Sequence, residues 1–253
     1  MLFSWKYVKI NHELYRDTVS YGKGVISVPE NISLTRGEQV KSKVLLAAAK
    51  LFLEKGYTES RMREISTLAG VNYGSMMFIF RFKEEILAEL VGFVLEGQFE
   101  STRKLLQGKT DDKILFYAAE TTLQLYLAES SEHMRELYSL SYSQAASSNV
   151  IYEKITVILS DIFREQYPSY TQGEFYEKEL ASAGVMRNYM TRPCGIYFTM
   201  DRKVRAFLEN TFLLYEIPRK KIEEAIKFVE GFDWKTIADD VIQRMMTYLE
   251  NKI

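Results

Sequence analysis

Apolar residues recur at intervals of three and four along most of this chain, the spacing that gathers side chains on one face of an α-helix. Prolines, which interrupt helices, number only four in 253 residues. The pattern therefore predicts an all-α protein. Residues 1–36 depart from it, because the segment 21–29 alternates only weakly and contains two glycines. We expect this N-terminal extension to be an arm that is either loosely ordered or docked on the body.

The first predicted helix begins near Gly37 and ends at Gly56. Apolar residues lie on one side of it between Val40 and Phe52, which is the pattern of a helix with one buried face. Gly56 can end the helix because glycine accepts the left-handed backbone conformation common just beyond a helix C-terminus.

Two short helices joined by a tight turn are predicted within residues 60–80. Ser60 can cap the first with its hydroxyl, and Gly70 supplies the left-handed residue of the turn. Asn72 can then cap the second, which begins at Tyr73. Such a helix-turn-helix places its second helix in the major groove of DNA. The side chains expected to point inward and hold the unit rigid are Ile65, Leu68, Val71, Met76 and Phe80.

One long helix is predicted from Glu84 to about Leu106, and six more follow it. Breaks between them are expected where glycine, serine or proline interrupts the apolar pattern. These breaks are residues 108–111, 130–131, 147–148, 168, 191–195, 218 and 231–233.

Residues 37–90 resemble the N-terminal domain of the tetracycline-repressor (TetR) family of transcription regulators. The resemblance depends on the spacing of short motifs across roughly a fifth of the chain. These motifs are Leu51-Phe52, Glu54-Lys55-Gly56-Tyr57, Ala69-Gly70-Val71-Asn72, Gly74-Ser75-Met76 and the segment from Phe80 to Leu87. The resemblance implies a DNA-binding domain at residues 37–97 and a helical effector-binding and dimerisation domain at residues 98–253.

The candidate DNA contacts lie at helix N-termini and on the second helix of the motif. Small residues at 74 and 75 allow the helix N-terminus to approach a phosphate, and Lys83 resembles the family's phosphate-contacting lysine. Where the family usually has tyrosine and then histidine, positions 77–79 are apolar, which favours thymine methyl groups and an A/T-rich operator. The full set is Ser60, Arg61, Asn72, Tyr73, Gly74, Ser75, Met77, Phe78 and Lys83.

Alternative interpretations remain open for these residues. Met77 and Phe78 can instead belong to the core or to a partner surface, and Lys83 can be a solvated residue at a helix start. The apolar second helix also suits a helical interaction protein that keeps the three-helix head and has lost DNA binding. A mobility shift that depends steeply on salt distinguishes a DNA-binding regulator from such a protein.

Aromatic residues are dense between positions 115 and 200. Tyrosines inside a helical bundle can line a pocket for a flat or apolar ligand, although core packing explains most such residues equally well. The candidate effector-pocket residues are Tyr117, Tyr126, Tyr138, Tyr142 and Tyr189. The effector itself is not identified by the sequence, beyond an expected apolar or aromatic character.

Two apolar stripes near the C-terminus suit a helical bundle formed across a two-fold axis, as the family resemblance implies. Core packing within one subunit produces the same pattern. The candidate dimer-interface residues are Val204, Leu208, Thr211, Tyr215, Val241, Met245 and Tyr248. A homodimer in turn demands a pseudo-palindromic double-stranded DNA operator.

Composition narrows the class of protein further. The formal net charge is only −1, so DNA binding requires a local basic surface. One cysteine, Cys194, excludes an intrachain disulfide and fits a reducing cytoplasm. We find neither a signal peptide nor a membrane-spanning stretch. His12 and His133 are not spaced like metal ligands with Cys194, so we expect no catalytic residues, no metal and no cofactor.

Overall fold

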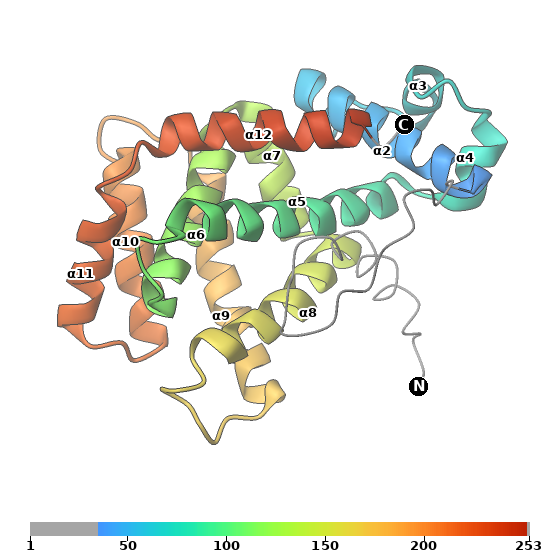
Figure 1. The fold of residues 1–253 in the computed structure, drawn as a ribbon. Helices are drawn as coiled ribbons and strands as arrows, with labels where there is room; N and C mark the ends of the chain where they lie inside the picture. Colours follow the sequence, from blue (N-terminus) through green and yellow to red (C-terminus); the bar gives the residue numbers. More distant parts are fainter. Residues whose placement is uncertain (1–34, 252–253) are drawn as a thin grey trace. The chain divides into compact units, whose positions relative to one another are not determined.

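The computed structural model describes residues 35–251, and the regular secondary structure in this range is helical (Figure 1). The predicted all-α class is confirmed. The predicted extension 1–36 lies, except for its last two residues, outside the described range. The helices are α2 (Arg36–Lys55), α3 (Met62–Leu68), α4 (Tyr73–Ile79), α5 (Lys83–Leu106), α6 (Lys113–Glu129), α7 (Glu132–Ser141), α8 (Ala145–Ile162), α9 (Gln172–Thr191), α10 (Met200–Leu214), α11 (Arg219–Val229) and α12 (Trp234–Asn251).

Helix α2 is closed at both ends by local interactions. At its start the Thr35 hydroxyl accepts a hydrogen bond from the Glu38 amide at 3.3 Å, and the Glu38 carboxylate accepts one from the Thr35 amide at 2.7 Å. At its end Gly56 adopts a φ of +87°, a conformation that favours glycine. The prediction that Gly56 ends the first helix is confirmed.

The turn between α3 and α4 forms as the sequence predicts. Gly70 has a φ of +63°, and the Asn72 side chain accepts a hydrogen bond from the Gly74 amide at 2.8 Å, which caps α4. Ile65 and Met76 are fully buried beneath the turn. The two helices are therefore held rigidly against α2.

Leu68 does not point inward as expected, because 52% of its surface is exposed. The buried side of α3 is centred between Ile65 and Ser66. Since successive helical residues rotate by roughly 100° about the axis, that placement turns Leu68 toward solvent. The sequence correctly predicted the helix and not the orientation of this residue.

Seven helices follow α5, one more than predicted. The expected break at residues 147–148 was wrong, because both serines lie inside α8. Their hydroxyls donate back to the carbonyl oxygens of Gln144 and Ala145, at 3.2 and 3.4 Å. Serines that satisfy their hydroxyls in this way remain in a buried helix instead of ending it.

Helix α6 lies at the centre of the larger part of the fold and packs against α5, α7, α11 and α12. Most of its residues are buried, including polar ones. Thr121 and Thr122 are accommodated because their hydroxyls donate to the carbonyl oxygens of Tyr117 and Ala118, at 2.8 and 2.7 Å.

The C-terminal helix α12 lies alongside α5 and reaches the N-terminal helix α2 (Figure 1). An ion pair of 2.8 Å joins Lys50 of α2 to Glu250 of α12, and Tyr248 stacks on Phe93 of α5. A Cβ at Gly97 of α5 would lie 2.8 Å from the Met245 side chain. Glycine at that position lets α12 approach α5 closely, and α5 continues unbroken past the predicted domain boundary at 97/98.

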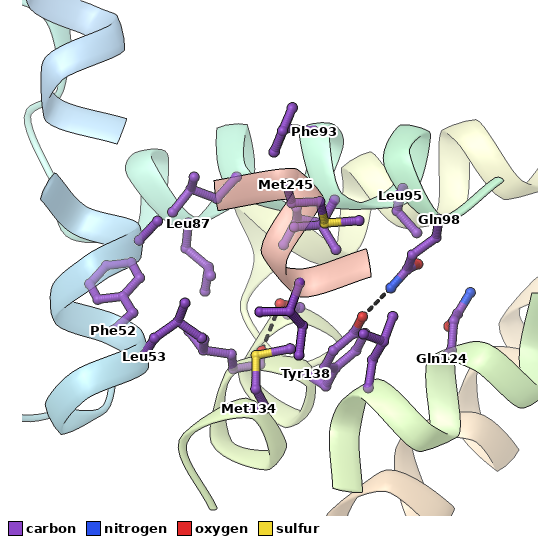
Figure 2. A pocket seen from close by; sticks show the side chains of 18 of the residues that line it. Phe52, Leu53, Leu87, Phe93, Leu95, Gln98, Gln124, Met134, Tyr138 and Met245 are labelled. Carbon is purple, nitrogen blue, oxygen red and sulfur yellow. Dashed lines mark hydrogen bonds between the residues drawn. The ribbon is translucent and has the colours of Figure 1, made fainter. Parts of the chain in front are cut away.

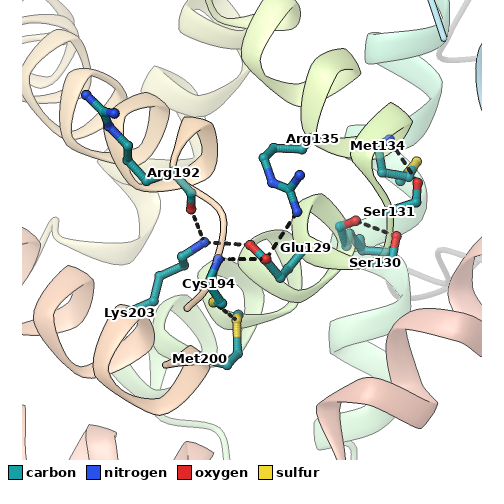
Figure 3. A network of polar contacts seen from close by, with 10 residues as sticks. Glu129, Ser130, Ser131, Met134, Arg135, Arg192, Cys194, Met200 and Lys203 are labelled. Carbon is teal, nitrogen blue, oxygen red and sulfur yellow. Dashed lines mark hydrogen bonds and ion pairs between the residues drawn. The ribbon is translucent and has the colours of Figure 1, made fainter. Parts of the chain in front are cut away.

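A buried ion pair fixes the junction between α6, α7 and α10 (Figure 3). Lys203 is only 1% exposed and donates to the Glu129 carboxylate and the Arg192 carbonyl oxygen, both at 2.6 Å. Glu129 also accepts hydrogen bonds from the Cys194 amide at 2.9 Å and from Arg135 at 3.1 Å. Burial tends to raise the pKa of Glu129, but the hydrogen bond from Lys203 and the other donors hold it below its usual value.

Within the described range, no helix combines the length and apolarity that a membrane crossing requires.

Candidate nucleic-acid interface

Helix α4 presents one side to the protein and the other to solvent. Met76 is fully buried inside the head, the name used here for the three helices α2, α3 and α4. Tyr73, Gly74 and Ser75 are exposed. Phe78 is 91% exposed, so the interpretation of this residue as part of the core is wrong. The Phe78 side chain is therefore free of the protein core and accessible to a partner.

Basic side chains flank the exposed side of α4. Arg61 precedes α3 and Arg81 follows α4, and both are exposed. Arg63 of α3 is also exposed, and its guanidinium lies 5.5 Å from the centre of the Tyr73 ring. The sequence analysis missed Arg63 and Arg81. Both arginines lie within or next to the helix-turn-helix of a chain with almost no net charge. That position in the sequence could have identified them as candidate phosphate contacts.

Two predicted DNA contacts are engaged inside the protein instead. Ser60 is only 1% exposed and donates its hydroxyl to the Gly56 carbonyl oxygen at 2.6 Å, so it does not cap α3, which begins at Met62. The Lys83 ammonium donates to the carbonyl oxygens of Tyr57 and Ser60, at 2.6 and 2.8 Å. These bonds satisfy the end of α2 and the loop after it.

The surroundings of Lys83 explain why its ammonium stays there. It lies 4.1 Å from the centre of the Tyr57 ring, a favourable cation–π arrangement. Burial lowers the pKa of Lys83. A phosphate contact by this lysine requires the ammonium to leave these carbonyl oxygens, and it stays a prediction.

The loop after α2 is also held by helix α7. The two carboxylate oxygens of Glu136 accept hydrogen bonds from the backbone amides of Tyr57 and Thr58, both at 2.9 Å. His133, one turn earlier on α7, lies 2.9 Å from the Leu53 carbonyl oxygen. Burial raises the pKa of Glu136, but the hydrogen bonds from Thr58 and Tyr57 outweigh it, so the carboxylate ionises more readily than usual. Helix α7 is therefore in direct contact with the end of α2 and the loop that leads to α3.

A sequence profile described as "Bacterial regulatory proteins, tetR family" matches residues 44–90. This segment runs from the middle of α2 through the helix-turn-helix into α5. By this match, the helix-turn-helix segment of the chain is similar to the DNA-binding segment of tetR-family regulators.

Two relatives support this assignment with different coverage. The "Probable HTH-type transcriptional regulator YttP" of Bacillus subtilis (strain 168) is 25% identical over 155 residues, which span 60% of this chain and 69% of that protein. The "HTH-type transcriptional repressor BepR" of Brucella suis biovar 1 (strain 1330) is 32% identical over 74 residues, 29% of this chain and 34% of that protein. Both relatives are named as HTH-type regulators of transcription.

A solved structure shares the fold beyond the head. RolR in complex with its ligand resorcinol superposes with a TM-score of 0.58 at 14% identity, covering 77% of this chain and 94% of RolR. This likeness shows that the helix-turn-helix head and the helical body of the chain share the fold of a solved structure.

The protein contains a cavity of about 110 Å³ between α2, α5, α6, α7, α8 and α12 (Figure 2). Its lining is almost entirely hydrocarbon. Figure 2 shows side chains converging on it from several helices, with Met245 of α12 on one side. Representative lining residues are Phe52, Leu53, Leu87, Phe93, Met134 and Met245.

The five tyrosines predicted to line one effector pocket do not share one. Tyr138 and Tyr142 line the large cavity, whereas Tyr117 and Tyr142 line a smaller one of about 30 Å³. Tyr126 and Tyr189 line neither of these two cavities. The Tyr189 hydroxyl instead accepts a hydrogen bond from the Asn210 side chain at 3.1 Å. Most of the cavity lining was missed because α2 and α12 are far apart in sequence and meet only in the fold.

The smaller cavity contains two buried carboxyl groups, Glu120 and Glu179. Burial raises the pKa of Glu120 to about 7, against a hydrogen bond from Gln124 that lowers it. Burial raises the pKa of Glu179 to about 8, where a hydrogen bond from Ser182 opposes the shift and the proximity of Glu120 adds to it. Both groups hold their protons more tightly than exposed carboxyls.

The stripe predicted to form the dimer interface lies mostly in the core, which corrects that expectation. Tyr215 stacks face to face on Phe163 at 4.1 Å between ring centres, and its neighbours on α10 are equally enclosed. Met245 and Tyr248 are half-buried and pack against α5. The predicted interface residues that are buried within one chain are Val204, Leu208, Thr211, Tyr215 and Val241.

Proposed function

We propose that this regulator is a homodimeric repressor that binds a pseudo-palindromic operator and releases it when a small molecule occupies the large cavity. Residues 37–97 form its DNA-binding domain, and residues 98–253 its effector-binding and dimerisation domain. The observation that carries the proposal is the exposed surface of α4 with basic residues on both sides. BepR is named a repressor and RolR binds resorcinol, which supports the repressor and effector roles.

The proposed DNA surface combines two kinds of contact. Tyr73, Met77 and Phe78 face base edges in the major groove, where apolar groups select thymine methyls. Exposed arginines contact phosphates and supply an affinity that salt weakens. The complete proposed surface is Arg61, Arg63, Asn72, Tyr73, Gly74, Ser75, Met77, Phe78 and Arg81, with Lys83 and Ser60 supporting it from within.

Operator binding is tested with DNA from upstream of the protein's own gene, by mobility shift across a series of salt concentrations. We expect a steep salt dependence. Replacing Arg63 or Arg81 by alanine should lower the slope of log affinity against log salt by about 1 for each phosphate contact removed. Lys227→Ala, at an exposed position of helix α11 and away from α4 (Figure 1), is the control and should leave the slope unchanged.

Phe78→Ala separates sequence recognition from phosphate binding. Because Phe78 is almost wholly exposed, we expect its loss to leave stability unchanged and to remove a preference for thymine in a selection of bound oligonucleotides. G/C-rich selected half-sites would contradict the apolar readout. A protein that shifts no DNA at either low or high salt would instead be the interaction protein that retains only the head.

The dimer face proposed here is on α9 and α10 and replaces the buried stripe. Tyr176, Leu180 and Gly184 follow one another at four-residue spacing on α9, and all are exposed. Leu180 is 44% exposed, and Leu213 of α10 is similarly exposed. Since α9 and α10 pack together, these side chains offer an apolar surface suited to a second copy across a two-fold axis.

Leu180→Glu tests this face by light scattering coupled to size-exclusion chromatography. We expect the wild-type protein to be a dimer and the variant to shift toward monomer. Leu68→Glu introduces the same charge at an exposed leucine of the head and should not change the mass. A Leu180→Glu protein that stays dimeric would place the interface elsewhere.

A further inference from the structure

We propose that the large cavity takes an uncharged, mainly hydrocarbon ligand about the size of one aromatic ring that carries a single hydroxyl group. The hydroxyl is received by Gln98 and Tyr138. This inference rests on the proposed function and specifies the chemical class of its effector.

The lining determines the charge and polarity of the ligand. No acidic, basic or histidine side chain of the described residues lines the cavity. An ionised ligand would lose its hydration there without gaining a counter-charge, which costs several kilocalories per mole. The site therefore selects neutral molecules.

Gln98 supplies the polar anchor of the cavity. It is fully buried on α5, and its amide nitrogen donates to the Tyr138 hydroxyl of α7 (Figure 2). Its amide oxygen has no hydrogen-bond partner among the described residues. A buried acceptor without a partner is unfavourable, so a ligand hydroxyl that donates to it gains more than it would in water.

The other polar groups on the lining are already engaged. Tyr142 donates to Gln124 at 3.2 Å, Gln124 donates to the buried Glu120 at 2.8 Å, and Ser141 donates to the Leu137 carbonyl oxygen at 2.7 Å. Among the described side chains that line the cavity, the polar atom without any hydrogen-bond partner is the Gln98 amide oxygen. A ligand with one polar group is thus matched better than one with several.

The volume sets the size of the ligand. An apolar cavity of about 150 Å³ holds a benzene ring; this cavity, at about 110 Å³, is smaller, so a single ring is the upper limit and requires side chains of the lining to adjust. Flexible methionines on α12, Met245 and Met246, line it and can adjust to a substituted ring. Larger fused-ring systems require α12 to move away from α5.

The position of the cavity connects such a ligand to the DNA-binding head. Phe52 of α2 and Tyr138 of α7 both line it, and the other side of α7 holds the loop after α2 through Glu136. A ligand that fits best when α2 and α7 separate slightly shifts the head toward that arrangement, by as much as its affinity differs between the two states.

The test measures binding of three probes to the full-length protein by calorimetry: p-cresol, toluene and benzoate. We expect p-cresol to bind about three- to tenfold more tightly than toluene, the effect of one net hydrogen bond. Benzoate should bind at least about 100-fold more weakly than p-cresol, because its charge is buried without a partner. Operator occupancy is followed separately by mobility shift with each probe.

Two variants assign the binding to this cavity. Gln98→Met should make p-cresol and toluene bind equally, whereas Gln107→Met, at the exposed end of the same helix, should preserve the difference. Ala49→Leu, which adds bulk to the lining, should weaken both rings about tenfold or more. Thermal unfolding verifies that each variant is folded. If Ala49→Leu is unstable, the ratio of the toluene and p-cresol affinities in Gln98→Met decides whether the rings bind in this cavity.

The inference is overturned if benzoate binds as tightly as p-cresol, if Gln98→Met keeps the preference for p-cresol, or if neither ring binds. Those results leave the proposed function intact provided that the protein still shifts operator DNA. Absence of any operator binding would instead refute the proposed function, whatever the rings do.

Discussion

Gly56 occupies a position where both the backbone and a neighbouring side chain exclude a Cβ atom. Its φ is +87°, and a Cβ there would lie 2.5 Å from a carboxylate oxygen of Glu136. The residue thus serves two purposes, since it ends α2 and lets α7 approach the loop that follows. Replacement at this one position affects the local backbone and the contact with α7 together.

We expect Gly56→Ala to lower the free energy of unfolding by about 1–3 kcal/mol, the cost of a strained backbone at a non-glycine residue. Urea denaturation followed by circular dichroism measures the change. Gly37→Ala is the matched control, because it lies in the first turn of α2 with nothing within 4 Å of the added methyl group. It should be neutral or stabilising by up to about 1 kcal/mol.

At the scale of single elements, α7 has two functional sides. Met134 and Tyr138 line the large cavity, while His133 and Glu136 contact the backbone at the end of α2 and in the loop after it. A short helix with one side on a ligand cavity and the other on the DNA-binding head can transmit a displacement between them. Because α7 contacts both the cavity lining and the head, coupling between them can be tested at this helix alone, without a longer chain of residues between the two sites.

Glu136→Gln should loosen the contact between α7 and the head. The glutamine side chain is neutral and has one oxygen, so it cannot accept both backbone hydrogen bonds that the carboxylate accepts. We therefore expect faster hydrogen exchange at the backbone amides of Tyr57 and Thr58. The change in operator affinity caused by p-cresol should shrink. Glu132→Gln, exposed in the first turn of α7, should change neither quantity; an unaltered p-cresol effect in Glu136→Gln would show that coupling runs elsewhere.

The ion pair between α6 and α10 offers a second prediction at this scale. Glu129→Ala leaves the buried Lys203 ammonium without its carboxylate, and we expect a loss of about 3–5 kcal/mol in the free energy of unfolding. Lys203→Met should cost less, because Glu129 keeps its bonds from Cys194 and Arg135. Equal losses in the two variants, measured by urea denaturation, would contradict this explanation.

Arg205→Met on α10 is the control for that comparison. Arg205 forms ion pairs with Glu209 and Glu223 on the surface at 3.1 and 3.4 Å. Exposed pairs contribute between about 0 and 1 kcal/mol, so this variant should remain close to the wild type.

At the scale of the whole molecule, the two buried carboxyls Glu120 and Glu179 make stability depend on pH. Their pKa values are raised from 4.5 to about 7 and about 8, so the folded protein keeps protons that the unfolded chain releases above about pH 4.5. The contribution of both groups is fully present below that pH. It is lost progressively as the pH rises from about 4.5 through the folded pKa values of about 7 and 8, with a slope of up to about 1.4 kcal/mol per pH unit for each group, and the loss is complete above them.

We therefore expect the free energy of unfolding, measured by urea denaturation between pH 5 and about 9, to fall as the pH rises to about 8 and to level off above it. Glu120→Gln combined with Glu179→Gln should flatten that decline, because the amides carry no proton to lose. Glu153→Gln, at an exposed glutamate of α8, should leave it unchanged. A double variant with the same decline as the wild type would assign the pH dependence to other groups.

Features that depend on residues close together in the sequence were predicted correctly more often than features that depend on distant segments. The turn between α3 and α4 was predicted correctly, since Gly70 and Asn72 act on backbone groups within two or three residues of themselves. Leu68 was assigned to the wrong side of its helix, because the two-turn helix α3 offers too few positions to define a buried face. Arg63 and Arg81 became candidates only when the structure placed them beside α4.

By itself, the sequence determined the helical class, the helix-turn-helix and the resemblance to a known family, because these follow from periodicity, capping residues and short spacings. Only the tertiary structure decided which apolar stripes face the core and which remain exposed. An apolar stripe such as Leu208 and Tyr215 shows in the sequence that one side of a helix is buried. It does not show whether that side packs within the same chain, as it does here, or against a second copy. The cavity between α2 and α12 and the engagement of Lys83 by distant carbonyl oxygens depend on segments that meet only after folding.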